Sequence, residues 1–179
     1  MKMAGSLLLK GAFCVLALAF WASVVLAANP ATIDVTVTIQ NLSVSATGPT
    51  AFGTVVASSE TVSGSASTVT NDGNVTETYA LKLTNPGGWT GTSGAPGAET
   101  YRLSAQFNSA QPTAVSFGAD HDLTTSDQTC SGTILAGDET GLSVAASGTR
   151  SLWFKFEAPT STTVTAEQTI TVTITASAG

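Results

Sequence analysis

Basic side chains, histidine and cysteine are scarce in this chain. Its 179 residues include six lysines and arginines, one histidine and two cysteines, and only 10% of the residues are charged. Because no basic patch is available to neutralise phosphates, we expect neither nucleic acid nor anionic membrane surfaces as partners. A zinc site needs three or four histidine, cysteine or carboxylate ligands at suitable spacing, and this sequence does not supply them.

Catalytic motifs are also missing from the sequence. It contains no G-x-S-x-G nucleophile motif and no glycine-rich phosphate loop with its lysine, and its dispersed acidic residues nominate no glycosidase pair. His121 lies between Asp120 and Asp122 in the polar stretch 118–127, where we expect a surface loop and a solvated imidazole. We therefore predict that the protein is not an enzyme. A secreted hydrolase that uses His121 is the last of the alternatives.

The first 27 residues have the pattern of an export signal. Lys2 and Lys10 provide positive charge, an apolar run of 17 residues follows, and the small residue Ala27 suits a cleavage site. We expect cleavage after Ala27 and no stable membrane insertion afterwards. A transmembrane anchor is the alternative, although the run is short for a membrane span. The predicted location is therefore secreted, extracellular or at the cell surface, with the periplasm as a further compartment.

Residues 28–179 are expected to form one acidic domain. The signal contains two of the six basic residues, which leaves four basic residues against twelve acidic ones. Only Cys130 remains in this part of the chain, so no disulfide can form within it. We expect a buried apolar thiol, with pairing between chains as the alternative.

Threonine and alternating patterns dominate this domain. Threonine occurs 30 times, and its branched side chain favours a pleated sheet over a helix. Apolar and polar residues alternate over 75–84, 101–107 and 151–157, as in strands with one buried face. We predict an all-β fold, a single immunoglobulin-like or jelly-roll-like β-sandwich of about seven to ten strands.

The segment 108–147 is the least regular part of the domain. Short strands are expected there at 112–117, 129–135 and 141–146, where apolar and β-branched residues gather. No linker in or near this segment is long enough to divide the domain.

Two tryptophans are candidates for binding saccharides. Trp89 lies in a loop rich in glycine and proline, and Trp153 lies in the strand predicted over 151–157. In that strand the core should receive Leu152, Phe154 and Phe156, and the outer face should present Trp153, Lys155 and Glu157. Exposed aromatic rings can stack on sugars, so a carbohydrate-binding or adhesive module is the first alternative function. The competing interpretation is that Trp89 plugs one end of the core and Trp153 covers the second face.

The same polar stretch that holds His121 has part of a calcium-binding pattern. Asp120, Asp122 and Asp127 alternate with hydroxyl side chains along a short loop, and such an array can wrap a hard cation. The loop lacks the glycine and the distal glutamate of an EF-hand. We name these three aspartates as a candidate calcium site, with a hydrated acidic loop as the alternative. No other cofactor is expected.

Two similar alternating runs, ATIDVTVTIQ at 31–40 and EQTITVTITA at 167–176, lie near the two ends of the domain. The apolar face of the first run consists of Ile33, Val35, Val37 and Ile39. Neither run has a lysine or a proline in its middle, the usual devices that stop an edge strand from recruiting another chain. Either both strands close their own sandwich, or residues 31–40 complete the sheet of a neighbouring molecule and so build a filament.

Two stretches resemble a known class of surface domain. VTNDGNVTETYALKLTNPGGW, at 69–89, resembles the V-x-N-x-G-N…Y-x-L strand–turn–strand of bacterial and archaeal immunoglobulin-like surface domains. Residues 145–176 resemble the closing turn, strand, proline-containing connection and final strand of those domains. The resemblance covers about a third of residues 28–179. It implies a bacterial, non-enzymatic module of a cell-surface protein, adhesin or filament.

These observations together predict a structural protein of the cell surface. Its most concrete form is a self-assembling subunit of an extracellular fibre or matrix, with residues 31–40 as the strand between subunits. The expected partners are further copies of the chain or other surface proteins, and glycans under the alternative function.

Overall fold

The computed structural model describes residues 30–48 and 50–179. The export signal predicted over 1–27 lies outside these residues. The chain divides into two units, residues 1–37 and 38–179, and the second unit contains all the strands of the described chain.

The N-terminal run 31–40 forms no strand in this structure of a single chain. Its apolar side chains are among the most exposed of the described residues: Ile33 88%, Val35 88%, Val37 85% and Ile39 79%. In this structure the run therefore does not close the sandwich of its own chain.

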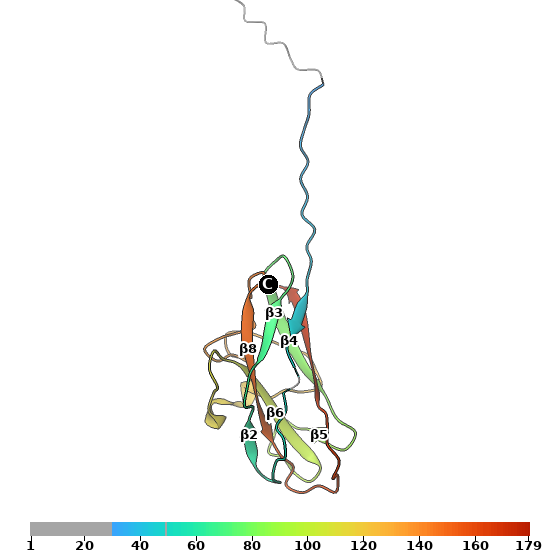
Figure 1. Ribbon diagram of the computed structural model, residues 1–179, viewed down its shortest axis with the longest axis vertical. Coiled ribbons are helices and arrows are strands. Elements are labelled where there is room, and N and C mark those ends of the chain that lie inside the picture. Colours follow the sequence, from blue (N-terminus) through green and yellow to red (C-terminus); the bar gives the residue numbers. More distant parts are fainter. Residues whose placement is uncertain (1–29, 49) are drawn as a thin grey trace, which may run out of the picture. The chain divides into compact units, whose positions relative to one another are not determined.

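Residues 38–179 form an all-β sandwich of two sheets, as predicted (Figure 1). The larger sheet has the order β1-β3-β8-β6-β5, and β2 also pairs with β8. Its strands are β1 (Val44–Ala46), β2 (Glu60–Val62), β3 (Ser67–Asn71), β5 (Thr90–Gly91), β6 (Thr100–Phe107) and β8 (Thr149–Glu157). The smaller sheet has the order β7-β4-β9, with β4 (Glu77–Thr84), β7 (Gln128–Thr129) and β9 (Thr171–Ala178). All pairs are antiparallel except β5 with β6.

The alternating runs form the long strands because alternate side chains reach one face of a pleated strand. In β8, Leu152, Phe154 and Phe156 are buried in the core, as predicted. In β6, Leu103 and Phe107 meet Phe156 and Leu152 across the ladder and join the same core.

The outer face of β8 is not open to solvent, which corrects the prediction for Lys155. Its side chain is 5% exposed, with Nζ 2.8 Å from Glu157 Oε1 and 5.8 Å from the centre of the Phe117 ring. The irregular segment 108–147 covers Lys155 on this face, because the Phe117 ring belongs to that segment. The alternation in the sequence correctly predicted which side chains of β8 face the core. It could not predict that another segment buries Lys155 on the opposite face.

The short strands predicted within that segment are largely wrong. Residues 112–117 contain the 3₁₀ turn η1 (Ala114–Ser116), and 118–127 contain η2 (Ala119–His121). The run 129–135 contributes only its first residue to β7, and 141–146 holds no strand, only a bridge from Val144 to Glu77. Apolar residues here plug the core one at a time, as Leu123 and Leu135 do, without the period of a strand.

Candidate assembly site

The smaller sheet ends on β9, whose second edge has no partner strand within the described residues. On its first edge β9 pairs with β4 over eight positions, from Glu77 opposite Ala178 to Thr84 opposite Thr171. The inward side chains of β4 are fully covered, with Tyr79 and Leu81 at 0% exposure. The inward side chains of β9 are only half-buried: Val172, Ile174 and Ala176, with Ile170 just before the strand. This half-covered face indicates that the sandwich lacks a strand beside β9.

A groove of about 950 Å³ lies along this face, and we call it the β9 groove. One wall is formed by Ile170, Val172 and Ile174, and residues 46–48, 50–55 and 57 also line the groove. Leu152, Phe154 and Phe156 of the core also line it. The groove therefore reaches into the apolar interior of the sandwich.

The groove is open because the chain leaves the larger sheet early. β1 is only three residues long, and the described residues between it and β2 contain no further strand. Between them Phe52 and Val55 pack against the core, and the Phe52 ring lies 5.5 Å from that of Phe156. Val56 is 73% exposed. An irregular segment with few anchoring side chains thus occupies the side of the sandwich where a strand is missing.

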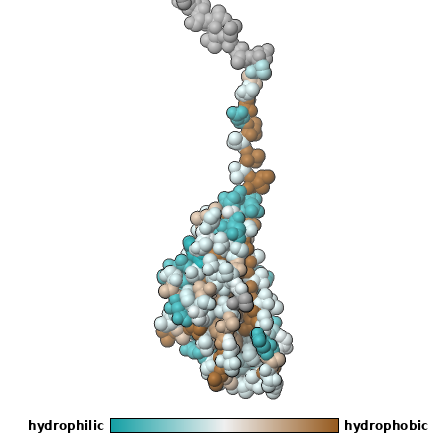
Figure 2. Space-filling view, in the orientation of Figure 1, coloured by the Kyte–Doolittle hydropathy of each residue, from teal (hydrophilic) through white to brown (hydrophobic). Residues whose placement is uncertain are grey.

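The segment that carries the predicted assembly strand has the matching chemistry. Ile33, Val35, Val37 and Ile39 alternate with Asp34 and threonines, and Figure 2 shows apolar side chains gathered along one side of this extended segment. The segment holds a single charged residue between 31 and 40.

Trp89 lines the same groove and does not stand free as a sugar platform. Its ring is 6.0 Å from that of Phe156 and 6.4 Å from that of Tyr101. Its Nε1 donates to Thr162 Oγ1 at 2.9 Å, and the Thr162 hydroxyl donates to Glu99 at 2.6 Å. Hydrogen bonds from Thr162 and Thr163 lower the pKa of Glu99. This placement agrees with the interpretation that Trp89 plugs one end of the core.

Trp153 lies elsewhere, in β8, and does not line the groove. It is half-buried, and its Nε1 donates to the carbonyl of Asn108 at 2.8 Å. The two tryptophans named from the sequence therefore belong to separate surroundings and form no joint binding face.

The three aspartates of the candidate calcium site have separate partners. Asp122 is buried and accepts a hydrogen bond from Ser104 Oγ at 2.7 Å, with Arg102 Nη1 3.8 Å from its second oxygen. Burial raises the pKa of Asp122, and the Ser104 hydrogen bond and Arg102 oppose this rise. Asp127 pairs with Lys82 at 3.3 Å, while Asp120 is exposed. Across residues 30–48 and 50–179, no group of three histidine, cysteine or acidic side chains is placed to hold a metal ion.

His121 is buried, which corrects the expected solvated loop. Its Nδ1 accepts from the backbone N–H of Gly118 at 2.8 Å, so Nε2 carries the hydrogen and donates to the Ala136 carbonyl at 2.9 Å. Both ring nitrogens therefore make hydrogen bonds within the irregular segment 108–147. Cys130 is a free, buried thiol, as predicted, and burial raises its pKa to about 12.

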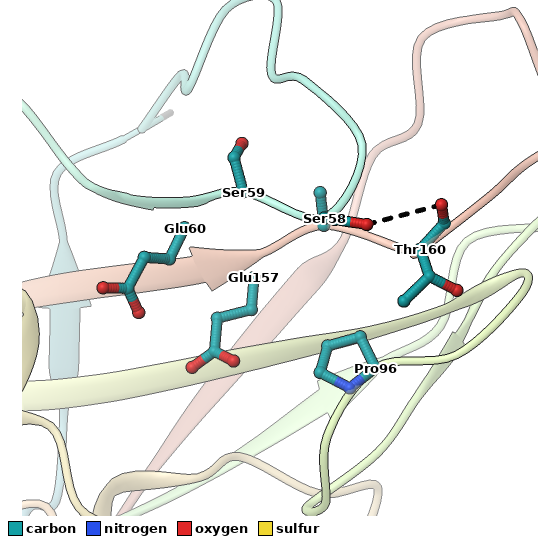
Figure 3. Close-up of a pocket in the computed structure, with 7 residues that line it drawn as sticks. Ser58, Ser59, Glu60, Pro96, Glu157 and Thr160 are labelled. Atoms are coloured by element: carbon teal, nitrogen blue, oxygen red, sulfur yellow. Dashed lines mark hydrogen bonds between the residues drawn. The ribbon is translucent and has the colours of Figure 1, made fainter.

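A smaller hollow of about 230 Å³ lies between the start of β2 and the end of β8 (Figure 3). Ser58, Glu60 and Glu157 line it, but Ser58 Oγ points to the Thr160 carbonyl at 3.5 Å. Burial raises the pKa of Glu157, but hydrogen bonds from Lys155 and Arg102 outweigh it, so the pKa is lowered overall. No histidine lines the hollow to activate Ser58.

No family model, curated protein or solved structure matches this chain. Within the described part of the chain, no helix has the length and apolar character needed to cross a membrane.

The sequence identified one half of the candidate site and missed the other. Residues 33–39 and the apolar face of β9 were visible as alternating patterns. The groove was not, because it depends on which strand lies beside β9 and on where β1 ends. The early end of the alternation after Val44 is the one signal in the sequence that could have suggested an open side.

Proposed function

We propose that this protein is a secreted, non-enzymatic structural subunit that assembles with copies of itself into an extracellular fibre or matrix. Residues 31–40 are the strand through which subunits join. One observation carries this proposal: four alternating apolar side chains are 79–88% exposed, and among the described residues the smaller sheet has a free edge at β9.

Exposed apolar side chains in this pattern favour association. Burying a valine or isoleucine side chain contributes about 1.5–3 kcal/mol each. A free strand edge offers hydrogen bonds to an incoming strand, and residues 31–40 contain neither lysine nor proline to discourage such pairing. Addition of a strand to a sheet edge combines both contributions.

Negative-stain electron microscopy of residues 28–179, beside a version that starts at Gln40, tests the proposal. Filaments or ordered aggregates from the longer form and none from the shorter one are expected. Circular dichroism of the shorter form must show the same sheet content, so that loss of assembly is not loss of folding. A longer form that stays monomeric at all concentrations contradicts the proposal.

A further inference from the structure

We infer that the β9 groove is the acceptor for residues 33–39 of a second copy of this chain, which pair antiparallel with β9. This inference rests on the proposed function and adds to it the acceptor surface, the register and the strand direction.

The two surfaces match in length and period. The incoming segment has four apolar side chains at every second position from Ile33 to Ile39. Ile170 and β9 have four inward positions at the same spacing, from Ile170 to Ala176, and each is half-buried in the single chain. The first three of these positions line the groove. Aligning these sets places Thr36 beside Thr173, whichever way the incoming strand runs. The polar face of the incoming segment then lies beside the threonine face of β9.

The position where the chain joins its own sandwich decides the direction. Asn41 N donates to Asn74 Oδ1 at 2.8 Å, and Gly179 N donates to the Thr76 carbonyl at 2.9 Å. The chain therefore joins the sandwich at the end where β9 finishes, as Figure 1 shows for β1 and the C-terminus.

An antiparallel incoming strand places Ile39 beside Ile170, at the opposite end of β9. The sandwich of the second copy then continues beyond that far end. A parallel strand would instead place the sandwich of the second copy at the end of β9 where the first copy's own residues 31–40 join. The second sandwich and that segment would then compete for the same space.

Each molecule then has one donor segment and one acceptor groove, and the groove receives its partner from the end of β9 opposite to the end where the chain joins its own sandwich. A head-to-tail contact repeats along a fibre wherever its rotation does not close a ring. The acceptor is lined by apolar and uncharged polar side chains, with Glu167 as its one charged lining residue among those described, and Asp34 is the only charge on the incoming segment.

Paired cysteines test the register in the full 28–179 chain. Thr171, Thr173 and Thr175 are exposed on β9, so substituting them leaves the core intact. Antiparallel strands bring facing residues within the reach of a disulfide. The informative variants are Thr36→Cys/Thr173→Cys for the register, Thr38→Cys/Thr171→Cys for the antiparallel direction and Thr38→Cys/Thr175→Cys for the parallel one. Thr36→Cys/Thr133→Cys is the matched control, because Thr133 is exposed outside the groove.

Mild oxidation followed by a non-reducing gel gives the readout, and native Cys130 stays buried throughout. We expect a ladder of covalent oligomers from the first two variants, and at least tenfold less from the parallel variant and the control. A ladder from Thr38→Cys/Thr175→Cys instead overturns the direction. A cross-linked monomer shows that the segment fills its own groove and overturns the second copy as occupant. A dimer without higher species shows reciprocal exchange and overturns the head-to-tail contact.

Electron microscopy of the same samples separates this inference from the proposed function. Filaments without a cross-link at 36 and 173 mean that the acceptor lies elsewhere, while assembly through residues 31–40 stands. Absence of any assembled species contradicts both this inference and the proposed function.

Discussion

Leu81 and Ile174 lie directly opposite each other in the β4–β9 ladder, yet Leu81 is fully buried and Ile174 is only half-buried. Both side chains point into the sandwich. Leu81 is covered because β4 has partner strands on both sides, whereas β9 has one on a single side among the described residues. The difference between the two exposures locates the missing strand beside β9.

This difference predicts unequal costs of truncation in the monomer. Leu81→Ala should lower the free energy of unfolding by about 2–5 kcal/mol, the usual loss for a fully buried leucine. Ile174→Ala should cost about half as much, since part of its surface already meets water. Urea unfolding of both variants, in a Val37→Asp background that prevents assembly, measures this. Equal losses would show that the groove is closed in solution.

Val37→Asp should abolish assembly without affecting the monomer. Val37 is 85% exposed, so a carboxylate there leaves the free energy of unfolding within about 0.5 kcal/mol of the parent chain. In an assembled fibre the same carboxylate would be buried against the apolar side chains of β9 without a partner. Light scattering across a concentration series measures assembly.

Val115→Asp is the matched control for that variant. Val115 is 91% exposed in η1 and does not line the groove. It should assemble like the parent chain. Equal loss of assembly in both variants would mean that added negative charge, and not residue 37, prevents association.

Glu157 should stabilise the fold in a pH-dependent way. It accepts from Lys155 and Arg102, and these interactions lower its pKa in the folded state. A carboxyl with a lowered folded pKa contributes stability above its unfolded pKa and loses it as pH falls through the folded value. Glu157→Gln should therefore cost about 1.5–3 kcal/mol at pH 7, as expected for hydrogen bonds to a charged group.

That cost should shrink as the pH falls from about 4.5 through the lowered pKa of Glu157. Urea unfolding at pH 7 and at pH 3 measures the difference between the variant and the parent chain, again in the Val37→Asp background. Exposed Glu167→Gln is the control and should change stability little at either pH. A cost for Glu157→Gln that is independent of pH would assign its effect to packing.

The sandwich could be predicted from the sequence because its long strands repeat every two residues. The runs that became β4, β6, β8 and β9 each place apolar side chains on one face, and burial of that face is a local consequence of the pleat. The fate of the opposite face is not local. Lys155 is buried by residues distant in sequence, so its environment could not be deduced from the pattern around it.

At the candidate site, too, the local pattern could be predicted but the contacts with distant residues could not. Residues 31–40 have the pattern of a strand as clearly as β9 does, but a strand needs a partner for its backbone groups. Whether that partner belongs to the same chain is decided by topology. His121 is a second example, because a polar stretch with one histidine has the composition of a solvated loop. Its two hydrogen bonds, to Gly118 and Ala136, depend on how the irregular segment 108–147 folds.

Gly141 is required by the packing around Cys130 and predicts a large effect from one methyl group. A Cβ at this position would lie 2.7 Å from Cys130 Sγ and 2.9 Å from Phe107 Cε2, closer than atoms pack in proteins. Gly141→Ala should therefore lower the free energy of unfolding by about 1–3 kcal/mol, the usual cost of overpacking a core. Thermal and urea unfolding measure the loss.

Two further variants identify the cause of that loss. Among the described residues, a Cβ at Gly132 would meet no atom within 4 Å, so Gly132→Ala should leave stability within about 0.5 kcal/mol. Adding Cys130→Ala to Gly141→Ala removes the sulfur that the methyl group meets. The double variant should then be less destabilised than the sum of the two single variants, because neighbours that share a clash are not additive. Strict additivity would mean that the strain arises at Phe107 instead of Cys130.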